Sequence, residues 1–194
     1  MTPDPVLGTE FVRALTYAVE LHGAMSRKAT TVPYLTHLLA VCSLVLEDRG
    51  TQAEAIAALL HDGPEDCGGE PVLAEIRRQF GDEVADIVRG LSDSLTPRGA
   101  EKEEWRKRKK AYLARLSREP RAVLRVSLAD KLHNARSIAV DLDRVGDKVW
   151  TRFNAGRDHQ AWYYKSLLAI FERRFRRSRN LPAFRSVVHQ LFPE

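Results

Sequence analysis

The segment AIAALLHDGPEDCG, residues 55–68, joins an apolar helix to a cluster of one imidazole and three carboxylates. Upstream of it, Thr51 and Glu54 have the spacing of a capping box, in which each side chain bonds to the other residue's backbone at a helix start. The apolar residues then recur at the period of one buried helical face: Ala53, Ile56, Ala57 and Leu60. The segment therefore predicts a short, buried helix.

The polar end of this helix is a potential metal and proton-transfer centre. Pro64 disfavours helical geometry in the residue before it, so we expect the helix to end close to Asp62. Glu65 and Asp66 should then lie in a short turn beside the pair formed by His61 and Asp62. A histidine and an aspartate after an apolar helix also fit an ordinary solvated helix end, so further ligands are needed elsewhere.

Two other predicted helices carry candidate ligands. His37 lies at the start of a second apolar helix, in THLLAVCSLV. In SLADKLHNARS, Asp130 and Asn134 are one turn apart on one face, while leucines mark the opposite face as buried. A carboxylate in so apolar a helix requires a partner, because burying an unpaired charge is costly.

The set H…HD…D, written here as His37, His61, Asp62 and Asp130, resembles the pattern of the HD-domain metal-dependent phosphohydrolases. Four motifs occur in order: RKATTVPYLTH, LLHDGPED, IRRQFGDEVADIVRGLSD and LADKLHNAR. They are similar to the hydrolase domain of the RelA/SpoT proteins and their small stand-alone relatives, which remove pyrophosphate from the 3′ position of guanosine alarmones. The resemblance covers about residues 22–164 and implies an HD-domain helical bundle.

The resemblance also implies a metal and a base. The four residues of the HD set would hold one divalent ion, for which the resemblance favours Mn²⁺. Their nitrogen and oxygen donors, with no thiolate, also suit Fe²⁺ or Zn²⁺. Glu65 and Asp66 match the family's ED pair, which would orient and deprotonate a metal-bound water. The alternative for these two acids is capping or ion pairing in a turn.

Substrate-binding residues are implied by the resemblance in three regions. Arg27 and Lys28 match a basic pair ahead of the first metal histidine, and Asn134 matches a position that touches the nucleoside. Arg157 and Tyr163 lie in NAGRDHQAWYYK, where relatives have a nucleotide-contacting tyrosine. For this last segment the competing interpretation is an aromatic core.

Length and composition indicate one all-α domain. The chain has 194 residues, 44% of them hydrophobic, and no segment alternates convincingly as a strand. We expect a single HD hydrolase domain over residues 1–194, with a C-terminal helical extension at residues 165–194. No apolar run is long enough for a membrane span and the N-terminus lacks a signal-peptide pattern, so we expect a cytoplasmic protein without a membrane partner.

The net charge of +5 is concentrated in two basic segments, residues 98–121 and 171–180. Both suggest an anionic partner, and a basic helix beginning near Arg98 would add positive charge opposite Arg27 and Lys28. An ordinary solvated helix face is the competing interpretation. The sequence motifs of nucleic-acid-binding modules do not accompany the charge, so a small-molecule nucleotide is favoured over nucleic acid.

Three functions remain open. The first is Mn²⁺-dependent removal of the 3′-pyrophosphate from ppGpp or pppGpp, giving GDP or GTP and pyrophosphate. The second is hydrolysis of another phosphorylated nucleotide, for example the 2′-phosphate of NADPH, with the same metal chemistry. The third is a catalytically silent nucleotide-binding module, against which the complete HD and ED sets argue. The sequence does not separate the first two and leaves the oligomeric state open.

Overall fold

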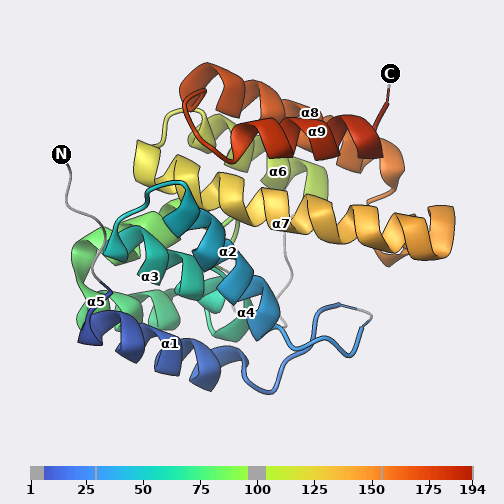
Figure 1. Cartoon of the computed structure of the whole chain (residues 1–194). Helices are drawn as coiled ribbons and strands as arrows, with labels where there is room; N and C mark the ends of the chain where they lie inside the picture. The colour runs from blue at the N-terminus through green and yellow to red at the C-terminus, as the bar shows by residue number, and fades with distance from the viewer. Residues whose placement is uncertain (1–6, 29, 96–103, 154, 194) are drawn as a thin grey trace.

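The computed structural model describes residues 7–28, 30–95, 104–153 and 155–193 (Figure 1). Within these ranges the regular elements are all helices, which confirms the predicted all-α class. They are α1 Thr9–His22, α2 Leu35–Glu47, α3 Gln52–Leu60, α4 Gly63–Cys67, α5 Glu70–Leu91, α6 Trp105–Leu116, α7 Arg121–Val145, the 3-10 helix η1 Gly146–Arg152, α8 Arg157–Arg174 and α9 Leu181–Leu191.

The long helix α7 crosses the molecule between two groups of helices (Figure 1). Helices α1 to α5 lie on one side of it, and α6, α8 and α9 lie on the other. A helix between two layers must bury more than one face. The buried residues of α7 are accordingly close to continuous in sequence: Val123, Leu124, Val126, Ser127, Leu128, Ala129, Asp130, Leu132, Ala135, Ile138 and Ala139. The candidate ligand Asp130 is therefore buried inside the bundle.

Helix α3 is buried and has the predicted cap. Oγ1 of Thr51 accepts a hydrogen bond from the Glu54 N–H at 3.2 Å, and a Glu54 carboxylate oxygen accepts one from the Thr51 N–H at 2.6 Å. Every residue from Glu54 to Leu60 is buried. Arg125 of α7 pairs with Glu54, so the capping carboxylate also links α3 to α7. The cap fixes the start of α3 and therefore the place at which the helix delivers His61.

Replacing Thr51 with alanine should lower the free energy of unfolding by about 0.5–2 kcal/mol, because the Glu54 N–H loses its acceptor. Urea denaturation should show a lower midpoint with an unchanged slope. Thr16→Ala is the matched control, since Oγ1 of Thr16 donates to the Val12 carbonyl one turn earlier in α1. A control effect as large as that of Thr51→Ala would contradict the importance of the cap.

The chain around Pro64 differs from the predicted turn. Helix α3 ends at Leu60, and a second short helix, α4, already begins at Gly63. Pro64 fits there because the first residues of a helix have no intrahelical partner for their N–H groups, so a proline in this turn loses no hydrogen bond. Glu65 and Asp66 therefore lie on the single helical turn of α4, where a short turn was expected.

Two further expectations concern the basic helix and the C-terminal extension. Arg98, the expected start of a basic helix, lies outside the described residues, and the basic helix α6 begins at Trp105. The expected start of the C-terminal extension at residue 165 falls inside α8. Among the helices described, none combines the length and the apolar character that crossing a membrane would require.

Candidate metal centre

Three regions of the bundle bring the predicted ligands together. Helix α2 contributes His37, the junction of α3 and α4 contributes His61 and Asp62, and α7 contributes Asp130. His37 Nε2 lies 3.4 Å from both Asp62 Oδ2 and Asp130 Oδ1. His61 Nε2 lies 3.1 Å from Asp62 Oδ2 and 3.8 Å from Asp130 Oδ1. Ligand atoms of His37, His61 and Asp62 all lie within 4.8 Å of one another, an arrangement that can hold a metal ion.

The hydrogen bonding of His61 fits a metal ligand. Its Nδ1 donates to the Ala58 carbonyl at 2.8 Å, which leaves Nε2 directed at the carboxylates. Although burial lowers the pKa of His61, Asp62 and Asp130 raise it well above its usual value, so the site attracts positive charge at this nitrogen. This Nε2 is buried and has no hydrogen-bond partner among the described residues. Two carboxylates cannot satisfy a lone pair on this nitrogen, whereas a proton or a metal cation can. The residues present therefore fit a divalent ion.

His37 is supported in the same way by His133. The two Nδ1 atoms lie 2.8 Å apart. Burial, with the charges of His37 and Arg27, lowers the pKa of His133 to about 4, so its ring is neutral and can accept a hydrogen bond. A His37 ring that donates Nδ1–H to His133 presents a bare Nε2 to Asp62 and Asp130. His133 thereby orients the candidate ligand from outside the centre.

Both aspartates of the centre remain ionised although they are buried. Burial opposes their charge, but His61 and His37 hold the pKa of Asp62 well below its usual range. The pKa of Asp130 is also held well below its usual range. The main cause is Lys131, whose Nζ lies 2.6 Å from Asp130 Oδ2, and the same two imidazoles lower it further. Ionised carboxylates are the form that binds a metal.

A chain of hydrogen bonds joins two predicted substrate residues to the centre. Asn134 Nδ2 donates to Asp130 Oδ1 at 2.5 Å, and Arg27 donates to Asn134 Oδ1 at 2.8 Å. Arg27 comes from the loop between α1 and α2, which also carries Lys28 as an exposed side chain. The structure therefore places Arg27 and Asn134 beside the candidate ligands.

Tyr34 is a residue of the site that sequence reasoning missed. Its hydroxyl donates to Asp62 Oδ2 at 2.7 Å, and its ring stacks on His22 with the centroids 5.0 Å apart. The guanidinium of Arg27 lies 5.8 Å from the centroid of the same ring. Tyr34 therefore fixes one oxygen of Asp62. Its position in VPYLTH, three residues before His37, was the only signal for it.

The two acids of α4 have different surroundings. Glu65 Oε1 accepts a hydrogen bond from the Asp93 N–H at 2.6 Å, whereas Asp66 Oδ2 lies 3.9 Å from His22 Nε2. Burial, with the carboxylates of Asp93 and Asp62, raises the pKa of Glu65 to about 7. A carboxyl group with a pKa near neutrality beside a metal-binding group is suited to accepting a proton from water.

Two lysines and Tyr163 form a further part of the site. Lys109 Nζ lies 2.6 Å from Asp93 Oδ2 and 5.1 Å from the Tyr163 ring centroid. Burial and the charge of Lys131 lower the pKa of Lys109. The Tyr163 hydroxyl is buried and unbonded among the described residues. The predicted substrate residue Tyr163 is thus accompanied by two lysines that the sequence did not single out, although Lys131 adjoins Asp130.

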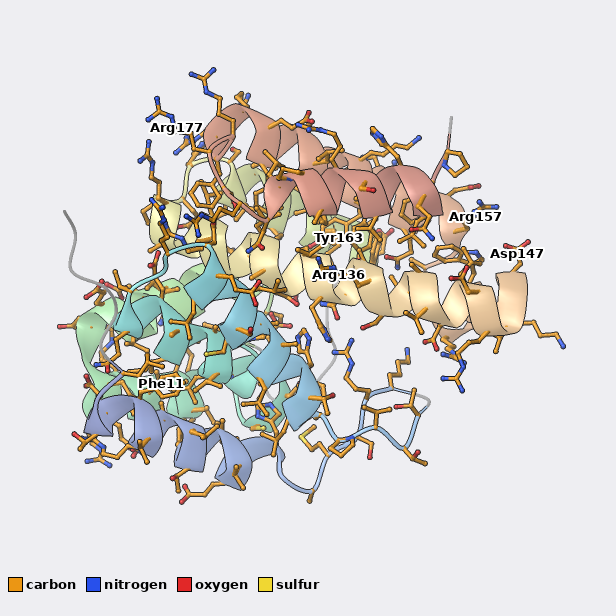
Figure 2. The ribbon with its side chains drawn as sticks, in the orientation of Figure 1. Phe11, Arg136, Asp147, Arg157, Tyr163 and Arg177 are labelled. Atoms are coloured by element: carbon orange, nitrogen blue, oxygen red, sulfur yellow. The ribbon has the colours of Figure 1, made fainter. Side chains whose placement is uncertain are left out.

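Arg157, the remaining predicted substrate residue, lies elsewhere. Its guanidinium is 4.0 Å from an Asp147 carboxylate oxygen and 5.8 Å from the Trp150 ring centroid. Figure 2 shows it beside Asp147 at the end of α7, away from Tyr163. The structure does not bring Arg157 to the metal-binding group, and its role in substrate binding stays a prediction.

Comparison with known proteins identifies the class to which this fold and centre belong. A family model described as an HD domain matches residues 14–160. The chain therefore belongs to the HD domain family.

Its relatives place it with the RelA/SpoT type of HD domain. It is 34% identical over 139 residues to a GTP pyrophosphokinase of Streptomyces antibioticus, covering 70% of this chain and 16% of that protein. It is 34% identical over 148 residues to a guanosine-3′,5′-bis(diphosphate) 3′-pyrophosphohydrolase of Aquifex aeolicus, covering 75% of this chain and 20% of that protein. The chain thus spans a fifth or less of the length of these relatives.

A solved structure shows the same fold over most of the chain. That structure is described as a metazoan ortholog of SpoT that hydrolyzes ppGpp. The match covers 94% of this chain and 96% of the chain of that protein. The TM-score is 0.73 at 22% sequence identity. At this identity the likeness concerns the fold.

Proposed function

We propose that the protein is a Mn²⁺-dependent hydrolase that removes the 3′-pyrophosphate of ppGpp and pppGpp, giving GDP or GTP and pyrophosphate. The observation that carries the proposal is the group of His37, His61 and Asp62, in which the buried Nε2 of His61, without a hydrogen-bond partner among the described residues, faces carboxylates. Membership of the HD domain family and the similarity to a named 3′-pyrophosphohydrolase support the reaction type.

The proposed roles follow from the contacts of each residue. The four predicted ligands would hold the ion, and a divalent ion bound there lowers the pKa of a coordinated water and neutralises charge on a phosphoryl oxygen. Glu65 would accept the proton of the attacking water. The Asp93 N–H fixes one oxygen of Glu65 and leaves the other available. Asp66, on the same turn, would help to orient the water.

The substrate carries phosphates at two ends of one nucleoside, so it requires cations from more than one element. Lys109 of α6 and Lys131 of α7 supply one pair, and Arg27 with Lys28 of the α1–α2 loop supplies another. Asn134 already bonds to Arg27, so a nucleoside that binds Asn134 would take the place of the Arg27 side chain. The unbonded Tyr163 hydroxyl would then donate to the substrate.

Turnover should fall on acidification, because Glu65 must be ionised to accept a proton. Its pKa is raised to about 7 by burial and the neighbouring carboxylates, and a bound cation would lower it, so the acid limb should lie at or below about pH 7. Below that limb kcat/KM should fall about tenfold per pH unit. The check is a pH–rate profile of wild type and Glu65→Gln at constant metal occupancy. An unchanged limb in Glu65→Gln would assign the ionisation to another group.

A release assay across a small panel of nucleotides tests the proposed substrate. The purified protein would be incubated with ppGpp, GTP, ATP or NADPH, each with and without Mn²⁺, and the products separated by anion exchange. We expect ppGpp to be consumed in the presence of Mn²⁺ and the other nucleotides to persist. Rapid dephosphorylation of NADPH, with ppGpp left unchanged, would contradict ppGpp as the substrate and favour NADPH. If none of the nucleotides in the panel is hydrolysed, the proposal that the protein is a nucleotide hydrolase would be contradicted.

A further inference from the structure

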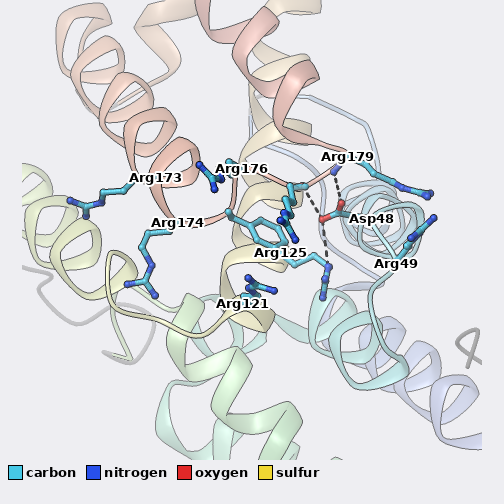
Figure 3. Close-up of a pocket in the computed structure, with 11 residues that line it drawn as sticks. Asp48, Arg49, Arg121, Arg125, Arg173, Arg174, Arg176 and Arg179 are labelled. Carbon is cyan, nitrogen blue, oxygen red and sulfur yellow. Dashed lines mark hydrogen bonds and ion pairs between the residues drawn. The ribbon is translucent and has the colours of Figure 1, made fainter. Parts of the chain in front are cut away.

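A cavity of about 680 Å³ lies at the N-terminal end of α7 (Figure 3). It is formed by the end of α2, the start of α7, and the end of α8 with the chain that follows it: Asp48, Arg49, Arg121, Arg125, Arg173, Arg174, Phe175, Arg176, Arg177, Ser178 and Arg179. None of these residues belongs to the metal centre. Asp48 follows His37 by eleven residues along α2, which corresponds to about 16 Å of helix.

The charges that line this arginine cavity are strongly unbalanced. Eight arginines face one carboxylate, that of Asp48. Asp48 is already engaged, because it accepts hydrogen bonds from Ser178 Oγ at 2.9 Å and from the Arg179 N–H at 2.6 Å. Among the described residues, five of the guanidinium groups have no ion pair or hydrogen bond: Arg49, Arg121, Arg173, Arg176 and Arg177. Positive charge of this density without counter-charge destabilises the unliganded fold.

Several residues that line the cavity are fixed by contacts with other parts of the fold. Arg174 donates to the carbonyls of Ser117 and Glu119 at 2.8 and 3.2 Å. Phe175 is buried, and the Arg125 guanidinium lies 5.5 Å from its ring centroid. Arg125 Nε is buried and lies 3.5 Å from Asp48 Oδ2, so Arg125 forms an ion pair with the one carboxylate of the cavity. Phe175, Arg125 and Arg174 are therefore fixed by contacts within the fold, while the unpaired arginines line the rest of the cavity.

Arg49 is kept at the rim in an unfavourable backbone conformation. It follows α2 with φ of 60°, in the left-handed region where helix ends usually place glycine. A side chain at such a position strains the backbone. Figure 3 shows Arg49 and Arg179 on one side of the hollow, Arg173, Arg174 and Arg176 on the other, and Arg121 and Arg125 below. The guanidinium groups thus surround a hollow and do not form a linear stripe.

We propose that the arginine cavity binds a small oligophosphate anion, either inorganic or the phosphate tail of a nucleotide, independently of the metal centre. Guanidinium groups bind phosphate oxygens in pairs of parallel hydrogen bonds, so several of them can enclose a chain of phosphates. The volume is that of a site for one small ligand. Nucleic acid would instead require a stripe of cations along a strand, with aromatic side chains for the bases.

Titration calorimetry with inorganic tripolyphosphate tests the site. The test variant is Arg121→Ala/Arg176→Ala, which removes unpaired guanidinium groups from two sides of the cavity. The matched control, Arg144→Ala/Lys148→Ala, removes two exposed cations at the other end of α7. We expect saturable binding to wild type and to the control, and an affinity at least about tenfold weaker in the test variant. Equal affinities in test variant and control would overturn the proposal.

A second arm separates the arginine cavity from the metal centre. Asp62→Ala should bind tripolyphosphate as wild type does, and loss of binding in that variant would overturn the proposal by assigning the anion to the metal centre. Tripolyphosphate should raise the thermal midpoint of wild type but not of the test variant. Without the anion the test variant should be at least as stable as wild type, because repulsion is relieved. Binding of a single-stranded RNA 20-mer without binding of tripolyphosphate would also overturn the proposal.

Discussion

Asp62→Ala should leave the protein folded but without stoichiometric metal. Asp62 Oδ2 lies 3.1 Å from His61 Nε2 and 3.4 Å from His37 Nε2. Its removal leaves the two imidazoles with Asp130 as the one carboxylate among the predicted ligands. Disturbing a residue that merely supports a metal ligand typically costs about 10–100-fold in affinity or activity. Removing a ligand should cost more, and we expect metal content and turnover to fall to background.

Elemental analysis and thermal unfolding with and without added Mn²⁺ check this prediction. A metal that binds only the folded state stabilises it by about 2.7 kcal/mol at a concentration 100 times its Kd. Wild type should show such a gain, and Asp62→Ala should lose it. Asp143→Ala, an exposed aspartate near the end of α7, is the matched control and should keep the gain. Stoichiometric metal in Asp62→Ala would refute the ligand assignment.

Glu65→Gln should separate chemistry from binding. Glutamine keeps the side-chain oxygen that accepts the Asp93 N–H, so the position of α4 should be preserved. It cannot accept a proton from water, so turnover should drop by about 10²–10⁴-fold while metal content and nucleotide affinity survive.

Steady-state kinetics, elemental analysis and equilibrium nucleotide binding measure the three quantities separately. Glu83→Gln is a suitable control, because Glu83 is exposed on α5 and is not part of the metal centre. Near-normal turnover in Glu65→Gln would show that Glu65 is not the base and would favour the alternative role of ion pairing or capping in α4. Loss of metal together with turnover would make Glu65 part of the metal-binding group.

The sequence predicted the parts of the site that depend on local pattern. The capping box of Thr51 and Glu54 located the start of α3, and the apolar period placed His61 and Asp62 at its end. The buried face of α7 indicated that Asp130 needed partners, which the structure supplies as His37, Lys131 and Asn134. Pro64 was misjudged because a proline stops one helix but is equally compatible with the first turn of the next.

Contacts between distant segments could not be predicted. Arg27 reaches Asn134 across 107 residues of sequence, and Tyr34 reaches Asp62 across 28. Lys109 lay hidden in a run of basic residues, and its contacts with Asp93 and the Tyr163 ring could not be predicted from that run. The basic segment at residues 171–180 was visible as charge, but the arginine cavity requires α2 and α7 as well. Such arrangements depend on tertiary packing, which cannot be predicted from the local patterns of a single sequence.

The metal centre should cleave the 3′ ester of guanosine 3′,5′-bispyrophosphate. Phosphorus NMR of the products tests it most directly, because GDP, pyrophosphate and orthophosphate give separate resonances. The proposal predicts equal amounts of GDP and intact pyrophosphate with Mn²⁺, and no reaction with Asp62→Ala. Orthophosphate without pyrophosphate, or unchanged ppGpp beside rapid hydrolysis of another nucleotide, would contradict it.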